Sequence, residues 1–274
     1  MANLDQNGIP ISPFLKWAGG KRWFAQEHRD LFGIERNRYI EPFLGSGAVF
    51  FKVDPSQAIL SDINKDLILT YIALRSHPRE IERALKKHHR NHSKDYYYTI
   101  RSSSPKTDIQ RASRFIYLNR TCWNGLYRVN LNGEFNVPIG TKTTVVLPTD
   151  DFLGVSQMLQ KADIRCCDFE ATIDDAEEND LLFIDPPYTI LHNTNGFVKY
   201  NEAIFSWNDQ LRLRDSIRRA IARGAKVILT NANHHSIKNL YEGIGQHRVV
   251  SRPSLISGTC RGRGIYEELV IQSL

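Results

Sequence analysis

The sequence lacks the features that mark membrane-bound and secreted proteins. No apolar stretch is long enough to cross a bilayer, and the first residues have neither the basic nor the apolar region of a signal peptide. The 4 cysteines have no spacing typical of a zinc site, and the vicinal pair Cys166-Cys167 could form only a strained disulfide. We therefore expect a cytoplasmic protein with reduced, buried thiols and no contact with a membrane.

Patterns typical of a metal site and of a phosphate-binding loop are also missing. His88, His89 and His92 lie in a polar helical stretch, and His234 and His235 lie in a loop. Neither group has acidic partners at ligand spacing, so we expect solvated histidines and no metal. No glycine-rich turn ends in Gly-Lys-Thr or Gly-Lys-Ser, which argues against a P-loop.

What is present is an ordinary globular composition with an excess of positive charge. Hydrophobic residues make up 41% and charged residues 24% of the 274 residues, enough for one large domain or a domain with an insertion. The formal net charge of +6 points only weakly to a polyanionic partner. Basic residues gather in 101–128 and 252–263, and this distribution strengthens the case for a nucleic acid.

Short apolar runs alternate with helical patterns along most of the chain. We expect helices at 64–74, capped by Asn64, and at 205–222, ended by Gly224. The expected strands lie at 39–40, 58–62, 164–168, 181–184, 226–230, 249–250 and 268–272, the last two as an antiparallel pair. Such alternation predicts an α/β sheet with helices on both faces.

The middle of the chain breaks this alternation. It has three helical patterns and then a segment rich in asparagine, glycine and aromatic residues, at 78–92, 94–101, 109–118 and 119–140. We interpret residues 67–142 as an insertion between two strands of the sheet. The chain then divides into one domain made of 1–66 with 143–274 and one inserted domain.

The most informative segment is Asp185-Pro186-Pro187-Tyr188, which follows the apolar run 181–184. Proline has no N–H and disfavours a helical conformation in the residue before it. We expect the carbonyl groups of Asp185 and Pro186 to point away from any regular ladder. The result is a cup rich in hydrogen-bond acceptors with an aromatic ring at its rim. Such a cup suits a planar group that carries an NH2, and a nucleobase is the obvious candidate.

Acidic residues end four of the expected strands, where open α/β sheets bind ligands. They are Glu41, Asp62, Asp168 and Asp185. Gly45-Ser46-Gly47 lets the backbone pass close to a ligand, and Asp62 is where a carboxylate would meet ribose hydroxyls. Each acid alone would more simply be a helix cap or a surface charge, but together they favour a nucleoside-containing cofactor.

A glycine turn near the N-terminus lies among lysine and aromatic residues, in the segment Lys16-Trp17-Ala18-Gly19-Gly20-Lys21. The glycine pair permits a tight backbone turn. Trp17 could anchor the core beside this turn, or it could close over a cofactor, and the residues alone leave both interpretations open.

The segment 119–140 also has two interpretations. Asn132-Gly133 predicts a hairpin turn. A hairpin that carries Trp123, Tyr127 and Arg128 could stack on bases and read guanine through a bidentate guanidinium contact. A purely structural hairpin with its tryptophan packed inside is equally compatible with these residues.

In this order, the motifs strongly resemble those of the Dam-type DNA adenine-N6 methyltransferases, the D12 class. Residues 16–21 are similar to the N-terminal motif of that family, 41–47 to the methyl-donor motif, 185–188 to the catalytic motif and 119–140 to the DNA-recognition hairpin. The resemblance covers nearly the whole chain. It implies a Rossmann-like S-adenosylmethionine-dependent methyltransferase sheet, with 67–142 as an inserted helical and β-hairpin target-recognition domain.

The resemblance also implies roles for individual residues. The catalytic residues would be Asp185, Pro186 and Tyr188. S-adenosylmethionine would be bound by Trp17, Lys21, Glu41, Phe43, Gly45, Gly47, Asp62, Asp168, Phe169 and Asp185. DNA would be bound by Lys16, Asn119, Arg120, Trp123, Asn124, Leu126, Arg128, Asn132, Pro138, Arg261 and Arg263. Among the donor contacts, Asp62 would hold the ribose, and Asp168 with Phe169 the adenine.

Four of the DNA-binding residues, Lys16, Leu126, Arg128 and Pro138, would contact the recognition bases. Trp123 stands where many relatives carry a tyrosine or phenylalanine that fills the space vacated by a flipped base. The larger indole still suits stacking, so the resemblance implies the same role for it.

The implied activity is methyl transfer from S-adenosylmethionine to N6 of an adenine flipped out of double-stranded DNA, within the target GATC. The enzyme would act as a monomer, either in a restriction–modification pair or alone. Two rivals stay open at this point. One is an RNA-base or protein-glutamine methyltransferase, against which the hairpin argues. The other is a DNA-binding relative without catalysis, against which the intact 185–188 motif argues.

Overall fold

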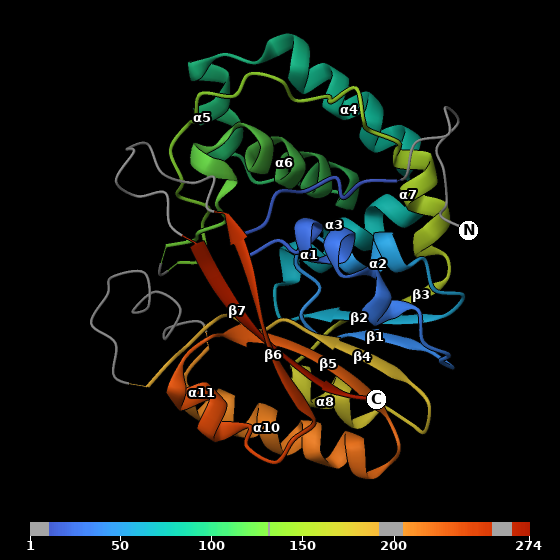
Figure 1. The fold of residues 1–274 in the computed structure, drawn as a ribbon. Coiled ribbons are helices and arrows are strands. Elements are labelled where there is room, and N and C mark those ends of the chain that lie inside the picture. Colours follow the sequence, from blue (N-terminus) through green and yellow to red (C-terminus); the bar gives the residue numbers. More distant parts are fainter. Residues whose placement is uncertain (1–10, 131, 192–204, 254–264) are drawn as a thin grey trace. The chain divides into compact units, whose positions relative to one another are not determined.

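The structure is a computed structural model that describes residues 11–130, 132–191, 205–253 and 265–274. These residues form two compact units (Figure 1). Unit 1 comprises the described residues of 1–33 and 44–166, and unit 2 comprises the described residues of 34–43 and 167–274. Each unit therefore combines two separate stretches of the chain. The predicted insertion, 67–142, lies wholly within unit 1, and its role as a target-recognition domain stays a prediction.

Unit 1 combines a pair of parallel strands with a group of helices. Strand β2 (Ala58–Asp62) pairs with β3 (Ala162–Cys166), and Leu60 lies opposite Ile164. The helices are α1 (Arg22–Glu27), the 3-10 helix η1 (Arg29–Phe32), α2 (Ala48–Val53), α3 (Lys65–Ser76), α4 (Pro78–Asn91), α5 (Lys94–Ser102), α6 (Asp108–Thr121), the 3-10 helix η2 (Trp123–Gly125) and α7 (Phe152–Leu159).

Helix α6 is central to unit 1, because it packs against α3, α4 and α5. Its start is fixed by a capping box in which Thr107 and Gln110 satisfy each other's backbone N–H. It continues three residues beyond the expected end at 118, because Asn119, Arg120 and Thr121 are buried against the rest of the unit. Helix α3 begins as expected, with the Asn64 side chain accepting the N–H of Leu67 at 3.0 Å.

Unit 2 is built on a mixed sheet. Its strands are β1 (Tyr39–Glu41), β4 (Leu181–Ile184), β5 (Lys226–Ala232), β7 (Ile265–Ser273) and β6 (Gln246–Pro253), in that spatial order. The first three are parallel, and β7 runs antiparallel to both β5 and β6. Helices α8 (Phe169–Asp174), α10 (Trp207–Ala222) and α11 (His235–Leu240) lie along one face of this sheet (Figure 1).

The predicted α/β class is therefore confirmed, and so is the closing antiparallel pair, in which Val250 lies opposite Glu268. The strand expected at 164–168 is wrong at its end, since β3 stops at Cys166. Asp168 instead caps helix α8 by accepting the N–H of Glu170 at 3.0 Å. A short acidic side chain that accepts a hydrogen bond from a nearby backbone N–H favours the start of a helix and does not favour continuation of the strand.

The recognition segment, residues 119–140, forms isolated bridges instead of regular strands, Cys122 with Ile139 and Val129 with Phe135. Its turn is also wider than the two-residue hairpin turn that Asn132-Gly133 predicts. The side chain of Asn130 accepts the backbone N–H groups of Asn132 at 3.0 Å and of Glu134 at 2.9 Å. Asparagine oxygens satisfy nearby backbone donors in this way, and here that bonding closes a longer turn.

His88 of α4 is half-buried and packed against aromatic rings, so the expectation of a solvated side chain is wrong for it, whereas His89 is exposed as expected. His88 stacks on Tyr117, with ring centroids 4.8 Å apart, and its Nδ1 lies 2.9 Å from Tyr96 Oη. Burial lowers the pKa of His88 to about 4. His89 accepts the backbone N–H of Val145 at 3.2 Å. The thiol expectation also needs a correction, because Cys122 is buried but Cys166 is exposed.

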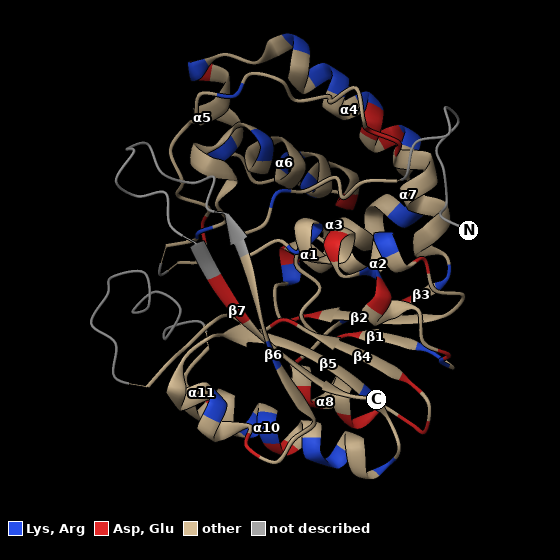
Figure 2. Cartoon of the chain, in the orientation of Figure 1, with Lys and Arg blue, Asp and Glu red and all other residues tan. Residues whose placement is uncertain are grey.

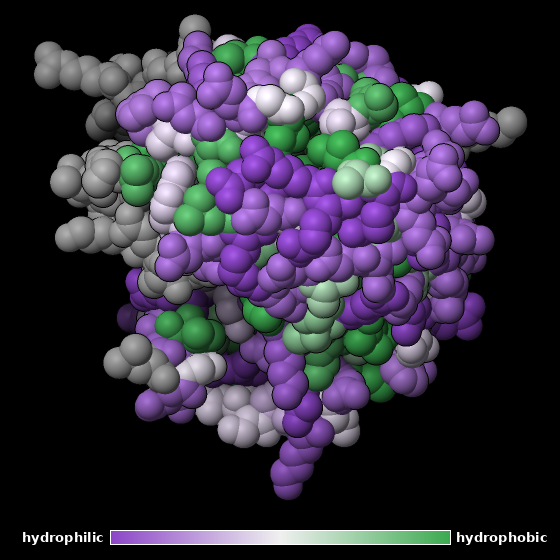
Figure 3. All heavy atoms as spheres, turned by 90° about the horizontal axis from the view of Figure 1, so that it is seen from below, coloured by the Kyte–Doolittle hydropathy of each residue, from purple (hydrophilic) through white to green (hydrophobic). Residues whose placement is uncertain are grey.

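The described surface carries mixed charge and dispersed apolar residues. Both basic and acidic residues occur along α4 and α10 (Figure 2). The face drawn in Figure 3 is largely hydrophilic, with smaller hydrophobic areas between. Among the residues that the structure describes, no helix combines the length and hydropathy that a membrane span requires.

Candidate active site and nucleic-acid interface

Asp185 directly follows β4, as the sequence predicts, and a neighbouring strand holds its carboxylate. Thr230 on β5 donates its hydroxyl hydrogen to Asp185 Oδ1 at 2.7 Å. Strands β4 and β5 run parallel, so their carboxyl ends lie at the same edge of the sheet. All four residues of β4 are buried, whereas Asp185 is partly exposed. A rigid strand end and a hydroxyl donor together set the orientation of this carboxylate.

Tyr188 is held by a second hydrogen bond at the same end of unit 2. Its hydroxyl donates to Glu268 Oε2 at 3.0 Å, and Glu268 is a buried residue of β7. Burial, reinforced by the negative charges of Asp185 and Glu268, raises the pKa of Tyr188 well above the usual value. The phenol therefore stays neutral, and its ring is tied to the sheet.

Two of the predicted donor-binding residues of unit 2 form an aromatic cluster. The rings of Phe43 and Phe169 are stacked, with centroids 5.3 Å apart. Phe205 packs against both, at 5.7 Å from Phe43 and 5.6 Å from Phe169. Phe169 and Phe205 are buried, so Phe43 is the partly exposed ring of the cluster. An aromatic ring offers a flat apolar surface to a planar ligand, and the adenine of a nucleoside-containing donor would fit against this part of the cluster.

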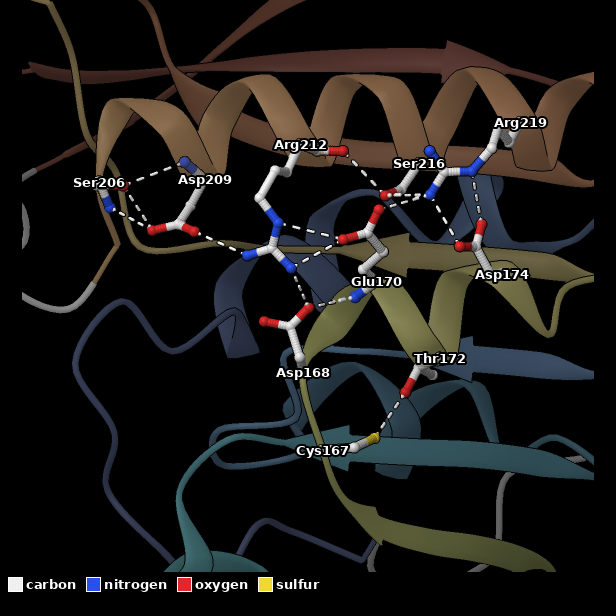
Figure 4. Close-up of polar contacts among 10 residues, drawn as sticks. All are labelled: Cys167, Asp168, Glu170, Thr172, Asp174, Ser206, Asp209, Arg212, Ser216 and Arg219. Atoms are coloured by element: carbon white, nitrogen blue, oxygen red, sulfur yellow. Dashed lines mark hydrogen bonds and ion pairs between the residues drawn. The ribbon is translucent and has the colours of Figure 1, made fainter.

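Asp168, beside this cluster, belongs to a network of charged side chains drawn in Figure 4. Its Oδ1 accepts a hydrogen bond from Arg212 Nη2 at 2.8 Å. The guanidinium of Arg212 also lies over the ring of Phe169, 4.9 Å from its centroid. Hydrogen bonds from Arg212 and Arg219 lower the pKa of Glu170, which keeps this carboxyl ionised.

Glu41, at the end of β1, is also buried and hydrogen-bonded. It is 3% exposed, and its Oε2 accepts the hydroxyl hydrogen of Tyr39 at 2.8 Å. Burial raises the pKa of Tyr39 well above its usual value, and the charge of Glu41 adds to this effect. The strand thus ends in an oriented carboxylate, as predicted for the donor motif.

In unit 1, Asp62 at the end of β2 is bonded to the glycine turn. Its Oδ2 accepts the N–H of Gly45 at 3.1 Å, and its Oδ1 accepts that of Asn64 at 2.9 Å. Burial raises the pKa of Asp62, and these backbone donors oppose the shift. Tyr71 donates its hydroxyl hydrogen to the Gly45 carbonyl at 3.1 Å. The structure thus brings together the acid and the turn that the sequence assigns to a donor.

Trp17 packs between the glycine turn and the recognition segment, which favours the structural interpretation of this residue. A Cβ on Gly45 would lie 2.7 Å from Trp17 Cδ1, so only glycine permits this approach. The indole also stacks on Phe115 at 6.4 Å and on Tyr127 at 5.8 Å. Lys21, four residues after Trp17, is buried, and its ammonium group donates a hydrogen bond to the Gly19 carbonyl at 3.1 Å.

Tyr127 differs from its predicted position. The sequence suggests that it could stack on bases, but its ring packs on Trp17 and its hydroxyl donates to Asp66 Oδ2 at 2.8 Å. The recognition segment is thereby joined to the start of α3, because Asp66 lies two residues after the cap residue Asn64. Tyr127 therefore connects the recognition segment with Trp17 and with helix α3.

The outward-facing part of the recognition segment is apolar and basic. Trp123 is 41% exposed, Leu126 41% and Val129 39%, so the tryptophan is not packed inside. Arg128 is exposed, and its Nε donates to Asn136 Oδ1 at 2.8 Å. This bond uses Nε of the guanidinium, and the two Nη groups have the geometry that a bidentate contact requires.

Other predicted DNA-binding residues occupy varied positions in unit 1. The side chains of Lys16, Asn124, Asn132 and Pro138 are exposed. The backbone of Lys16 is held by Asn119, which accepts its N–H at 2.9 Å and donates to its carbonyl at 2.8 Å. These two bonds hold the backbone of Lys16 in place while its side chain is exposed. Arg261 and Arg263 lie outside the described residues.

Asn119 and Arg120 are interior residues, each 2% exposed. Arg120 forms a bidentate ion pair with Asp150, at 2.6 and 2.7 Å, and donates to the carbonyls of Phe14 and Val145. A direct DNA contact would require this packing to open. We therefore revise the expectation for both residues and assign them a structural role in holding the recognition segment.

Replacing Arg120 with alanine is expected to lower the free energy of unfolding by about 3–5 kcal/mol, because Asp150 would be left as a buried, unpaired charge. Urea denaturation measures this loss. If Arg120 instead contacted a phosphate, the variant would keep its stability, and the salt dependence of DNA binding would fall by about one unit of slope. That combination would refute the structural role.

Several residues that support the site were not predicted. Thr230, Glu268, Arg212 and Phe205 act on predicted residues through tertiary contacts and lie outside the motifs of the sequence. Asn136 lies within the recognition segment, and its bond to Arg128 appears only in the structure.

Comparisons with known proteins identify the family. Residues 17–254 match the family model described as D12 class N6 adenine-specific DNA methyltransferase. The chain is 34% identical to the type II methyltransferase M1.LlaDCHI of Lactococcus lactis, covering 95% of each chain. It is 35% identical to the type II methyltransferase M.MjaIII of Methanocaldococcus jannaschii, covering 96% of this chain and 99% of that one. It is 34% identical to a DNA adenine methylase of Vibrio cholerae, covering 94% of each. The chain therefore belongs to the D12 class of N6 adenine-specific DNA methyltransferases.

Proposed function

We propose that this enzyme transfers a methyl group from S-adenosylmethionine to N6 of an adenine that is flipped out of double-stranded DNA, within the sequence GATC. The observation that carries the proposal is that the Asp185 carboxylate and the Tyr188 ring are both held in place by hydrogen bonds. Thr230 holds the Asp185 carboxylate, and Glu268 holds Tyr188 three residues later. An amine-bearing base stacked on Tyr188 would present its N–H groups to the acceptors of the 185–188 motif.

The donor would be bound by residues that each unit holds in place. In unit 2, Phe43 and Phe169 offer stacked rings for the adenine, and Asp168 offers a carboxylate for its amine. In unit 1, Asp62 would accept hydrogen bonds from the ribose, beside the Gly45 turn that it already holds. Trp17, Lys21, Glu41 and Gly47 stay in the proposed set. When bound, S-adenosylmethionine supplies an electrophilic methyl group.

In the proposed reaction the protein positions the adenine amine and stabilises the charge that develops on it. The N6 lone pair of adenine is delocalised into the ring, so the free amine is a poor nucleophile. Acceptors on its two N–H bonds, the Asp185 carboxylate and the Pro186 carbonyl, localise that lone pair. The nitrogen then attacks in line, a carbon–nitrogen bond forms as the carbon–sulfur bond breaks, and the surplus proton leaves to solvent. Asp185 stabilises the positive charge that develops on nitrogen.

Flipping the base costs a few kcal/mol of unstacking and unpairing. Stacking on Tyr188 would recover about 1–3 kcal/mol. The exposed indole of Trp123 is the group that we propose fills the gap left in the duplex, because a large planar ring can replace the lost stacking. Arg128 would read guanine in the major groove, with Lys16, Leu126 and Pro138 near the other bases.

A cavity of about 360 Å³ in unit 1 supports a DNA backbone beside the recognition segment. Its lining includes the basic residues Arg101 and Arg114, the hydroxyl groups of Ser102 to Ser104, and the acidic residues Asp66 and Glu134. Arg114 is held by the carbonyls of Ile100 and Arg101. Guanidinium and hydroxyl donors in one cavity suit a phosphate oxygen.

Methylation of unmodified genomic DNA with labelled S-adenosylmethionine, followed by mapping of the modified sites, tests the proposal. We expect N6-methyladenine in GATC and in no other frequent sequence. N6-methyladenine in a different sequence would refute the target but keep the reaction. Label in RNA or in a glutamine amide, with none in duplex DNA, would refute the substrate. Donor binding without transfer would identify a catalytically inactive relative.

A further inference from the structure

We propose that Arg212 is a positioning residue for donor recognition: it orients the Asp168 carboxylate toward the exocyclic amine of the donor's adenine and anchors Phe169 beneath that base. The inference rests on the proposed donor site and adds a residue that no motif contains. Arg212 touches both residues to which we assign the adenine, one by an ion pair and one by a cation–π contact.

The first step of the argument is the geometry of Asp168. Its Oδ1 accepts two hydrogen bonds, from the backbone N–H of Glu170 at 3.0 Å and from Arg212 Nη2 at 2.8 Å. Figure 4 shows that Oδ2 points away from both donors and makes no bond with the other residues drawn. Two donors on one oxygen set the plane of the carboxylate, and the second oxygen is then presented as an acceptor.

The second step is the way in which Arg212 itself is held. Glu170 Oε2 accepts from its Nε at 3.2 Å and its Nη2 at 2.9 Å, and Asp209 Oδ1 accepts from its Nη1 at 2.9 Å. Asp209 is fixed in turn by the capping box that it forms with Ser206 at the start of α10. These half-exposed ion pairs contribute little stability singly, but together they give each nitrogen of the guanidinium a carboxylate acceptor.

The third step is the contact with Phe169. The Arg212 guanidinium carbon lies 4.9 Å from the centroid of this ring, within the range of a cation–π interaction. Phe169 is the first residue of α8 and stacks on Phe43. One side chain of α10 thus sets both the polar and the aromatic contact proposed for the adenine, which a sequence motif would not reveal.

Arg219 provides a matched control in the same chain. It lies two helical turns after Arg212 on α10, and its side chain is 43% exposed, against 42% for Arg212. It bonds the other oxygen of Glu170, Oε1, at 2.8 Å, and it pairs with Asp174. Figure 4 shows no bond from Arg219 to Asp168. Replacing either arginine removes the same charge from the same helix face.

The experiment measures the affinity of the full chain for two donor products by titration calorimetry. S-adenosylhomocysteine carries the exocyclic amine, and S-inosylhomocysteine carries a carbonyl oxygen in its place. Because a carboxylate attracts the amine and repels the carbonyl, wild-type protein should favour the adenosyl compound. We expect Arg212→Ala to lose about tenfold in affinity for it and most of the preference, since hydrogen bonds to charged groups contribute on this scale. Arg219→Ala should retain both.

Two further variants separate the possible failures. Arg212→Lys keeps the charge but not the planar fork, so it should restore only part of the preference. Asp168→Asn removes the acceptor charge while asparagine still caps α8, and it should abolish the preference. If Asp168→Asn binds both compounds as the wild type does, the proposed donor site is wrong. If it loses the preference while Arg212→Ala and Arg219→Ala behave alike, the role of Arg212 is refuted and the donor site stands.

Discussion

Replacing Asp185 with alanine is expected to lower the rate of methyl transfer by about 10²–10³-fold, while the fold and donor binding survive. This carboxylate is the one charged group of the 185–188 motif, and in the proposed mechanism it stabilises the positive charge that develops on N6 in the transition state. Removing one well-placed electrostatic partner of a transition state typically costs this much. Single-turnover methylation of a GATC duplex measures the loss directly.

Thr230→Val is the control for this prediction. It removes the hydroxyl that bonds Asp185 at 2.7 Å and keeps the shape of the side chain. We expect only a few-fold loss, because one neutral hydrogen bond contributes about 0.5–1.5 kcal/mol. Full activity of Asp185→Ala would overturn the mechanism, and an equal loss in both variants would assign the effect to the strand end as a whole.

The second large effect is expected for Arg128→Ala, which should lose about 1–3 kcal/mol of discrimination at one base pair of the target. The reason is geometric, since Asn136 holds one edge of the guanidinium and the other can form a bidentate contact with guanine. Methylation rates on duplexes substituted at each position of GATC measure the discrimination. Only one position should become tolerant of substitution.

Arg83→Ala is the matched control, because it removes the same charge from an exposed side chain of α4, 74% accessible and outside the recognition segment. It should weaken binding no more than modestly and leave the sequence preference unchanged. Asn136→Ala keeps the Arg128 guanidinium but removes its support, so an intermediate loss is expected. A sequence preference that survives in Arg128→Ala would contradict the assignment.

Features that depend on neighbouring residues were predictable from the sequence. Asn64 begins α3, Gly224 follows the end of α10 with a φ of +89°, and Asp185 follows a buried strand. Each depends on a local preference: a side-chain cap, a left-handed backbone or an apolar run. The order of the motifs then sufficed to indicate the family.

Predictions failed where a distant residue changes the role of a side chain. Arg120 has the same charge as Arg128 and lies eight residues away, yet Asp150 and the carbonyls of two remote segments make it an interior residue. Tyr127 was a candidate for base stacking until Trp17 and Asp66 accounted for its ring and hydroxyl. Composition and spacing carry no information on such partners.

The sequence alone determined which chemistry the chain contains, because Asp185-Pro186-Pro187-Tyr188 and the acids after the strands are local arrangements of donors and acceptors. Only the tertiary structure decided how those groups are oriented. Thr230, Glu268 and Arg212 come from other strands and helices and hold the carboxylates and the ring in place. A hydrogen bond fixes orientation only when both partners are in position, and packing between elements distant in the chain supplies the second partner.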